Sequence, residues 1–299
     1  MRILVTGATG LIGSALVTAL RGDGEMVLRA TRHEPRDAGD VRWDADRGFA
    51  TGPPALLDAV VHLAGEPLAE GAWSAARKAA LRSSRVDGTR RLAEALAAMT
   101  PKPRVMISGS AVGIYGDRGD ERLTELSPAG EGYLADLARD WEAASRPASS
   151  AGIRVVTMRT GMVLTPRGGA LAKLLTPFRF GLGGPFGNGK MLMSWIGLGD
   201  LVRAMRHMLI HGDLAGPVNA VAPEPLRNAD FARALGRALH RPAVLPLPPF
   251  ALRAMLGRER ADQMLLASQR AEPARLLQSG FIFETPEVQA ALERELGTA

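Results

Sequence analysis

Three glycines near the amino terminus have the spacing that a phosphate-binding turn requires. They lie in the segment Thr6-Gly7-Ala8-Thr9-Gly10-Leu11-Ile12-Gly13, which directly follows a short apolar run. Gly7 permits a tight turn, Gly10 lets the backbone approach a diphosphate, and Gly13 lets a helix pack closely on a strand. The N–H groups that open this helix, at Leu11 and Ile12, would then face the phosphates. A glycine-rich turn without a ligand is the alternative, but its position between a strand and a helix favours dinucleotide binding.

The end of the second apolar run indicates which dinucleotide fits. A site for NAD usually carries Asp or Glu about twenty residues after the turn, where the carboxylate holds the ribose 2′-hydroxyl. This chain has Thr31 and Arg32 at that place instead. A guanidinium can bind a 2′-phosphate through two parallel hydrogen bonds, and Thr31 can add a hydroxyl. An exposed Arg at a strand end is the alternative reading of Arg32, yet the missing carboxylate favours NADP over NAD.

The elements that must position this turn alternate between strands and helices. Short apolar runs typical of buried strands are Ile3–Val5, Met26–Ala30, Val60–Leu63, Val105–Ser108 and Val155–Met158. The helical patterns between them include Leu11–Arg21, Trp73–Met99 and Tyr133–Ser145. This alternation predicts an α/β protein with a Rossmann-type, doubly wound parallel sheet that helices cover on both faces.

The later part of the chain has a different character. Residues 165–189 are rich in Gly and Pro, which predicts a loop-rich cap over a site. Further helices are predicted at Asp200–Ile210 with Asp200 as N-cap, and at Asn228–Leu239, Pro249–Leu256 and Pro286–Leu296, while Val218–Val221 could return a strand to the sheet. We therefore expect a Rossmann domain of residues 1–164, completed by about 196–222. A smaller, mostly helical substrate-binding cap and C-terminal domain would comprise residues 165–195 and 223–299.

The composition is that of an ordinary globular protein. Hydrophobic residues make up 46% and charged residues 23% of the 299 residues, which excludes disordered, collagen-like and coiled-coil chains. The chain has no Cys, so thiol nucleophiles, Cys-based zinc sites and iron–sulfur clusters are excluded as well. His207 and His211 have the spacing of some zinc ligands, but no third ligand is evident, and we expect no metal site.

Charge and hydropathy restrict the partners that the protein can have. The net charge is +6, yet the basic residues are scattered among acidic ones, so we expect no nucleic-acid partner. No apolar run approaches the ~18 residues of a membrane span, and the first residues lack the pattern of a signal peptide. We therefore expect a cytoplasmic protein with a small-molecule substrate and no membrane partner. A homodimer is one assembly that the sequence allows.

Several motifs resemble one known family. They are the glycine turn, the run Val61-His62-Leu63-Ala64-Gly65 and the run Ser108-Gly109-Ser110-Ala111-Val112-Gly113-Ile114-Tyr115-Gly116. Together they resemble the extended short-chain dehydrogenases/reductases, the NAD-dependent epimerase/dehydratase family. Other segments resemble an atypical epimerase-family branch with its own small C-terminal domain, and they include Trp141-Glu142, Arg159–Leu164, Pro177–Pro185 and Ser268-Gln269-Arg270. The resemblance covers nearly the whole chain.

The resemblance implies a set of residues that contact the cofactor NADP(H). These residues are Gly7, Thr9, Gly10, Leu11, Ile12, Gly13, Thr31, Arg32, Leu63, Ala64, Gly65, Arg85, Ser108 and Val163. Leu63 and Ala64 have an alternative as plain core residues, and Arg85 has one as a solvated charge on a helix.

The same resemblance implies the residues that transfer protons. Classical members of the family use a Ser or Thr, a Tyr and a Lys. The Lys lowers the pKa of the Tyr, which exchanges a proton with a carbonyl or hydroxyl while the nicotinamide moves a hydride. The catalytic hydroxyl is expected at Ser110, and Tyr133 lies at about the right distance beyond it. Capping of a strand end is the alternative for both Ser108 and Ser110, and packing of an aromatic ring is the alternative for Tyr133.

The lysine of this set is missing. One helical turn after Tyr133 the sequence has Leu137, which can neither hold a tyrosinate nor bind a ribose. If Tyr133 transfers a proton, another group must lower its pKa, and Arg85 and the positive charge of the nicotinamide are the candidates. The set of catalytic residues is therefore incomplete.

Residues and resemblance together predict an NADP(H)-binding oxidoreductase or epimerase-like enzyme. Its substrate would be a small carbonyl or hydroxyl compound, for example one that resembles a nucleotide sugar. This substrate would lie between the nicotinamide, Ser110, Tyr133 and residues 165–189. The alternative is a catalytically inactive module that binds NADP(H) and serves in regulation or redox sensing. Leu137 favours this alternative, whereas the presence of Ser110 and Tyr133 favours the enzyme.

Overall fold

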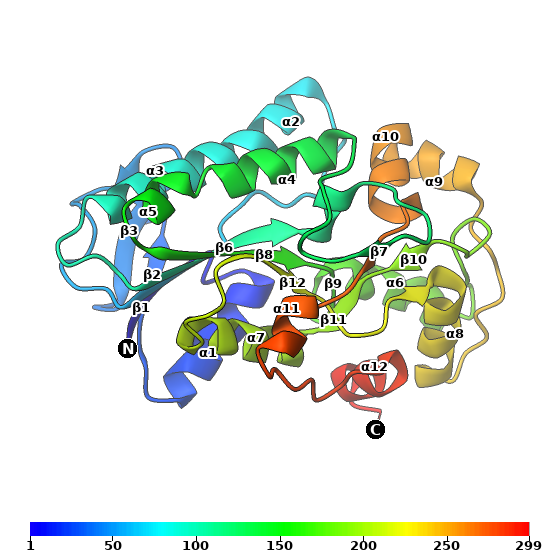
Figure 1. The fold of residues 1–299 in the computed structure, drawn as a ribbon. Helices are drawn as coiled ribbons and strands as arrows, with labels where there is room; N and C mark the ends of the chain where they lie inside the picture. Colours follow the sequence, from blue (N-terminus) through cyan, green and yellow to red (C-terminus); the bar gives the residue numbers. More distant parts are fainter. Residues whose placement is uncertain (299) are drawn as a thin grey trace. The chain divides into compact units, whose positions relative to one another are not determined.

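The apolar runs of the first half of the chain form the centre of one sheet in the computed structural model, which describes residues 1–298. The sheet has eight strands in the order β12-β8-β6-β5-β1-β2-β3-β4. Their bounds are Arg2–Thr6 (β1), Met26–Thr31 (β2), Asp40–Asp44 (β3), Gly48–Phe49 (β4), Ala59–His62 (β5), Val105–Ala111 (β6), Arg154–Thr160 (β8) and Gly216–Ala220 (β12). The pairs β1–β2, β2–β3, β1–β5 and β5–β6 are parallel, and β3–β4 is antiparallel. The predicted Rossmann-type α/β fold is confirmed (Figure 1).

The order of the strands places a switch point beside the first strand. The chain goes from β1 outward to β2 and β3 and then returns to β5 on the other side of β1. The connections that follow β1 and β5 therefore run in opposite directions along the sheet. In sheets of this kind ligands bind outside the carboxyl ends of the strands at such a switch point.

The chain divides into two compact units. The first comprises Met1–Ser110, Leu137–Met158 and Val202–Val218, and the second comprises Ala111–Asp136, Arg159–Leu201 and the chain from Asn219 onward. Predicted cofactor-contact residues up to Ser108 belong to the first unit, and Val163 belongs to the second.

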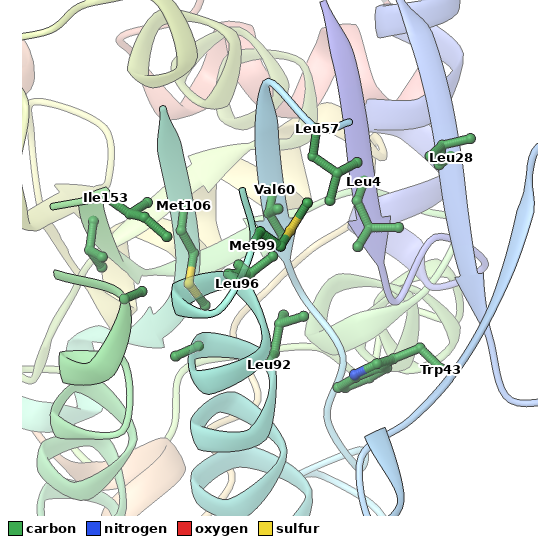
Figure 2. Packing of buried hydrophobic residues seen from close by; sticks show 13 residues of the cluster. Leu4, Leu28, Trp43, Leu57, Val60, Leu92, Leu96, Met99, Met106 and Ile153 are labelled. Carbon is green, nitrogen blue, oxygen red and sulfur yellow. The ribbon is translucent and has the colours of Figure 1, made fainter. Parts of the chain in front are cut away.

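One buried cluster of the first unit lies between the sheet and two helices. Leu4, Val60 and Met106 are paired across β1, β5 and β6, so their side chains share one face of the sheet. Leu92 and Leu96 pack against them, and all five side chains are fully buried (Figure 2). Because burial of one such side chain stabilises a fold by ~1.5–3 kcal/mol, this layer holds the three central strands in register.

Helices of the first unit follow the predicted pattern with one local difference. Their bounds are Leu11–Gly22 (α1), Ala75–Arg82 (α2), Gly88–Ala97 (α3) and Arg146–Ser150 (α5), and the α4 helix, Tyr133–Ala143, and the α7 helix, Leu198–Ile210, have residues in both units. The single helix predicted at Trp73–Met99 begins later, at Ala75, because the Ser74 hydroxyl accepts a hydrogen bond from the Arg77 N–H. A π-helical turn, Ser83–Asp87, then joins α2 to α3. Such turns occur often at functional sites, and this one contains Arg85.

The second unit has short strands and several helices. Three parallel or antiparallel pairs join Arg122–Leu123 (β7) to Arg270–Ala271 (β14), Met162–Leu164 (β9) to Trp195–Gly197 (β11), and Leu192–Met193 (β10) to Leu226–Arg227 (β13). Its helices include Gly169–Arg179 (α6), Asn228–Ala238 (α8), Pro249–Leu256 (α9), Arg258–Ala261 (α10), Ala274–Gln278 (α11) and Val288–Leu296 (α12). A core of buried residues from β11, α6, α8 and α12 holds it together, and the members include Trp195, Leu171, Phe231, Leu235 and Leu292. The predicted helical C-terminal region is confirmed.

The predicted loop-rich cap at residues 165–189 is wrong for its first half. Helix α6 occupies Gly169–Arg179 and buries Leu171, Leu175 and Phe178. These residues recur at the spacing of one helix face, and this apolar stripe outweighs the flanking Gly and Pro residues. The remainder, from Phe180 to Gly189, contains no helix or strand.

The predicted N-cap role of Asp200 is also wrong. The α7 helix begins at Leu198, so Asp200 lies inside its first turn. The buried Asp200 carboxylate accepts hydrogen bonds of 2.8–2.9 Å from the Glu284 N–H and from the N–H and hydroxyl of Thr285. It therefore anchors the segment before α12 rather than the end of its own helix.

Candidate cofactor site

The carboxyl ends of three neighbouring strands bring the predicted site residues of the first unit together. Thr6 of β1 is paired with His62 of β5, and His62 is paired with Ser108 of β6. The glycine turn, the loop that begins at Leu63 and the end of β6 therefore start side by side at one edge of the sheet.

The glycine turn lies against the loop after β5 with no space for side chains. A Cβ atom on Gly7 would stand 2.8 Å from the carbonyl carbon and oxygen of Leu63, and Gly7 has a left-handed φ of +66°. A Cβ atom on Gly13 would stand 2.1 Å from the carbonyl oxygen of Gly7. Both glycines are therefore required, one for the approach of two loops and the other for the packing of α1 on its own turn.

The start of α1 has the properties of a phosphate-binding helix end. The helix begins at Leu11. Its N-cap residue is Gly10, which has no side chain that could accept a hydrogen bond from the first amides. Thr9 and Gly10 are exposed, and Leu11 and Ile12 are half-buried. The first N–H groups of a helix lack partners within the helix, and the helix dipole favours an anion there. The backbone of this turn fits the diphosphate of a dinucleotide.

Arg32 follows β2 directly and is open to solvent. Its side chain is 71% exposed, and the guanidinium lies 4.0 Å from the Glu66 carboxylate. Such a long and exposed ion pair contributes little to stability, so it leaves the guanidinium able to bind an anion. The Thr31 hydroxyl accepts a hydrogen bond of 3.2 Å from the His33 N–H.

Arg85 is held in place and is not a solvated charge. Its guanidinium donates a hydrogen bond of 2.9 Å to the carbonyl oxygen of Glu66 and stands 5.2 Å from the centre of the Trp141 ring. A Cβ atom on Gly65 would lie 3.4 Å from the Arg85 guanidinium carbon. Arg85 therefore borders the loop after β5, beside Gly65, and its contact with a cofactor stays a prediction. Leu63 and Ala64 are half-buried at the start of that loop.

A buried polar network that the sequence analysis missed lies beneath the turn. The Thr6 hydroxyl bonds to His62 Nδ1 at 2.7 Å, and His62 Nε2 bonds to the Thr89 hydroxyl at 3.0 Å. The Trp141 Nε1–H donates to the same Thr89 hydroxyl at 3.0 Å. Burial lowers the pKa of His62 from 6.5 to about 4, so this imidazole is neutral at physiological pH. A polar His inside the apolar run of β5 was the sequence signal for this network.

Two serines at the end of β6 have different environments. Ser108 is fully buried, and its hydroxyl donates to the Gly109 carbonyl oxygen at 3.4 Å. The Ser110 hydroxyl donates to Glu142 Oε1 at 2.7 Å. Ser110 was predictable from the sequence but its contact with Glu142 was not, because the two residues are 32 positions apart. Ser110 is therefore more than a strand cap, since a carboxylate fixes the direction of its hydroxyl.

Tyr133 and Val163 belong to the second unit. Tyr133 is the first residue of α4 and is half-buried, and the following N–H, of Leu134, donates to Gln263 Oε1 at 2.9 Å. Val163 is half-buried in β9, where it pairs with Ile196 of β11. In the first unit, Leu137 is 5% exposed and so is a core residue.

The other tyrosine of the chain has a structural environment. Tyr115 is fully buried, and its hydroxyl lies 2.7 Å from Asn219 Oδ1 and 3.0 Å from the Thr124 carbonyl oxygen. It also accepts a hydrogen bond of 3.0 Å from the Arg159 guanidinium. Burial is the largest influence on Tyr115 and raises the pKa of its hydroxyl. Tyr115 therefore lacks the properties of a proton-transfer residue.

Residues 1–298 contain few other features that could bind a ligand. No group of three His, Asp or Glu residues in this range could hold a metal ion, and the His207 and His211 rings stack at 3.5 Å. No helix in the same range is long and apolar enough to cross a membrane. A surface depression of about 600 Å³ in the second unit contains none of the predicted site residues, and its lining is Arg233, Gly236, Arg237, His240, Arg241, Ala243 and Val244.

Two family models match this chain. Residues 3–221 match the NAD dependent epimerase/dehydratase family, and residues 247–295 match a domain of unknown function (DUF1731). An epimerase family protein of Mycobacterium leprae is 44% identical over 291 residues, which are 97% of this chain and 94% of that protein. The human epimerase family protein SDR39U1 is 38% identical over 299 residues, which are 98% of this chain and 99% of that protein.

Solved structures agree with these matches. The crystal structure of human SDR39U1 (isoform 2) with NADPH has a TM-score of 0.92 and 36% identity, and each chain covers 100% of the other. The nucleoside-diphosphate sugar epimerase from Corynebacterium glutamicum has a TM-score of 0.79 and 39% identity, over 99% of this chain and 58% of that chain.

The sheet order and the closely packed glycine turn define a dinucleotide-binding protein of the Rossmann type. The chain belongs to the NAD-dependent epimerase/dehydratase family. The predicted family and its small C-terminal domain are confirmed, and so is the predicted class of cofactor, NAD(P), which this family binds.

Proposed function

We propose that this chain is an NADP(H)-dependent oxidoreductase or epimerase-like enzyme that acts on a small carbonyl or hydroxyl compound. One observation carries the proposal: the glycine turn packs against the Leu63 backbone and opens α1 with amides that no side chain caps, while exposed Arg32 directly follows the adjacent strand β2. The NADPH bound to human SDR39U1 supports the choice of dinucleotide.

Residues of the first unit would hold the cofactor in this proposal. Amides at the start of α1 bind the diphosphate, and Arg32 with Thr31 binds the 2′-phosphate. Leu63, Ala64 and Arg85 border the same edge of the sheet. A bound nicotinamide supplies a hydride donor or acceptor.

Ser110 is the residue most directly prepared for chemistry. Because its proton is held by Glu142, its oxygen offers lone pairs to a hydrogen-bond donor such as a substrate hydroxyl. We also propose Tyr133 for proton transfer and the second unit for substrate binding. The name of the Corynebacterium glutamicum relative supports a substrate like a nucleotide sugar.

A regulatory module that binds NADP(H) without turnover is the second candidate. The buried apolar side chain of Leu137 favours it, because this helix position carries the catalytic Lys in classical members of the family. We infer for either candidate a cytoplasmic protein with a small-molecule ligand and without a nucleic-acid partner. We also propose that the protein forms a homodimer.

Nicotinamide fluorescence tests the cofactor first. We expect NADPH to bind more tightly than NADH. Arg32→Ala should weaken the binding of NADPH by about tenfold, the equivalent of ~1.4 kcal/mol, and should have little effect on the binding of NADH. Arg36→Ala, a change of a nearby exposed arginine, is the control and should leave both affinities unchanged. Equal affinities for both dinucleotides that Arg32→Ala does not alter would refute the preference for NADP.

Turnover separates the enzyme from the module. Oxidation of NADPH across a panel of carbonyl compounds, lost in Ser110→Ala and in Tyr133→Phe while NADPH still binds, supports the enzyme. Tight binding of NADPH without turnover of any compound in the panel supports the module.

A further inference from the structure

The hydrogen bonds around Thr6 fix the position of its proton. The Thr6 oxygen accepts from the N–H groups of Leu63 and Ala64 at 3.1 and 3.2 Å. A hydroxyl oxygen has two lone pairs, so both are occupied and the Thr6 hydroxyl must donate its own proton. The atom that receives it is His62 Nδ1, at 2.7 Å.

This assignment leaves His62 with one tautomer. Because Nδ1 accepts a proton, the ring carries its hydrogen on Nε2 and donates it to the Thr89 hydroxyl oxygen at 3.0 Å. That oxygen also accepts from the Trp141 Nε1–H. Thr6, His62 and Thr89 are fully buried, so no solvent molecule competes for these bonds. The Trp43 ring also contacts His62 in an edge-to-face arrangement, with the ring centroids 5.5 Å apart, and carries no charge.

The network joins the parts of the candidate cofactor site. Thr6 immediately precedes the glycine turn, and its oxygen holds the first two amides of the loop after β5. That loop lies so close to Gly7 that a Cβ atom there would meet the Leu63 carbonyl group at 2.8 Å. If His62 Nδ1 carried a proton, it would be a donor that competes with the loop amides for the Thr6 hydroxyl oxygen. The Leu63 N–H also donates to the Thr6 carbonyl oxygen at 3.3 Å, so the Ala64 N–H is the amide that would lose its partner.

We propose that His62 is a positioning residue for the dinucleotide. By accepting the Thr6 proton it keeps the Thr6 lone pairs on the loop amides, and so sets the spacing between the glycine turn and the loop after β5. The inference rests on the proposed function, since it requires a dinucleotide at this edge of the sheet. It assigns a role to a residue that touches neither cofactor nor substrate.

Two substitutions of His62 separate the two sides of the ring. Asn places its amide oxygen at the position of Nδ1 and can still accept the Thr6 proton, but it does not reach Thr89. Gln places its amide nitrogen near the position of Nε2 and can still donate to Thr89, but it leaves the Thr6 proton without its acceptor. Both remove one buried hydrogen bond, so both should destabilise the fold to a similar degree.

The experiment measures NADPH affinity by calorimetry and folding stability by urea for the wild type, His62→Asn and His62→Gln. We expect His62→Asn to stay within about threefold of the wild-type affinity and His62→Gln to weaken it by about tenfold or more. Equal affinities of the two variants, or affinities that follow stability alone, would overturn the inference. Failure of the wild type to bind NADPH would instead overturn the proposed function, and the inference with it.

Two further measurements keep the inference testable if a His62 variant does not fold. Thr6→Val should weaken NADPH binding, whereas Thr6→Ser, which keeps the hydroxyl, should bind NADPH with nearly the wild-type affinity. Thr89→Val, a matched change of a buried threonine, should also leave the affinity near wild type. Nitrogen NMR of labelled wild-type protein should show His62 neutral with its hydrogen on Nε2. A hydrogen on Nδ1, or an effect of Thr89→Val equal to that of Thr6→Val, contradicts the proposal.

Discussion

The two units of the molecule bury polar groups in opposite ways. In the first unit, Thr6, His62, Thr89 and Trp141 form a network without a charge. In the second, the buried cluster contains the Arg159 guanidinium and the Glu125 carboxylate beside Tyr115 and Asn219 (the Arg159 cluster). Burial of a charge costs much more than burial of a neutral group and requires strong hydrogen bonds in return.

The lengths of the strands explain the difference. Four- to seven-residue strands hold the centre of the first unit through backbone hydrogen bonds, so its polar side chains need only adjust the ends of the strands. Strands of two or three residues leave the segments of the second unit without such a ladder. There the Glu125 carboxylate accepts from the N–H groups of Asn219 and Arg275, and Asp200 accepts from the segment before α12. Charged side chains replace the backbone ladder where strands are short.

Arg159→Met tests this comparison with the largest expected effect. The guanidinium is 7% exposed and donates to the Tyr115 hydroxyl at 3.0 Å and to the Glu125 carbonyl oxygen at 3.3 Å. Its removal takes the positive charge from a cluster that keeps a buried carboxylate, so we expect a loss of ~3 kcal/mol or more in the free energy of unfolding. Urea denaturation measures it, with Arg146→Met at an exposed position as the control. A loss below that of the control would show that the charge does not hold the unit together.

The neutral network gives a pH-dependent prediction of intermediate size. The folded pKa of His62 is lowered from 6.5 to about 4, so an unfolded chain binds a proton at this residue between these values while the folded chain does not. The contribution of neutral His62 to the free energy of unfolding is complete above pH 6.5 and is lost as pH falls toward 4. At pH 5 the loss is roughly 2 kcal/mol. Stability of the wild type minus that of His62→Asn, measured from pH 7 to pH 5, isolates this residue from the other titrating groups. If the difference in stability between the wild type and His62→Asn stays constant with pH, burial does not keep His62 neutral.

Much of the first unit could be predicted from the sequence because its signals are local. The run Ile3–Val5 and the glycine spacing identify β1 and its turn to within a residue at each end, since strand periodicity and turn chemistry depend on neighbours in the chain. Helix α6 was missed because its apolar stripe is surrounded by Gly and Pro residues. Tertiary packing of Leu171, Leu175 and Phe178 decides its structure, and these contacts are not local.

The contacts within the candidate site could not be predicted from the sequence, because they too join residues that are far apart in the chain. Thr6 and His62 are 56 residues apart, and Ser110 and Glu142 are 32 apart. Residue types indicated that a polar group ends each strand, but only the register of β1, β5 and β6 brings these groups into contact. The glycine turn was predictable as a phosphate-binding element, whereas the residues that position it were not.

Tyr115→Phe has the smallest expected effect and separates the two tyrosines. Phe keeps the buried ring and its contact with the Arg159 guanidinium, which stands 5.2 Å from the ring centre. It removes the hydroxyl that bonds to Asn219 and Arg159, and the net value of such bonds is ~1–2 kcal/mol. We therefore expect a loss of that size in the free energy of unfolding by urea, smaller than the loss in Arg159→Met because the cation remains.

The same variant tests which tyrosine takes part in chemistry. If the Arg159 cluster only holds the second unit together, Tyr115→Phe should lower stability and leave NADPH affinity and oxidation unchanged. Tyr133→Phe should abolish NADPH oxidation while stability and NADPH binding are kept. The raised pKa of Tyr115 argues in the same direction, because a group that resists ionisation is a poor base near neutral pH. Loss of NADPH oxidation in Tyr115→Phe without a change in stability would reverse the two roles, and the charged cluster would then belong to the catalytic site.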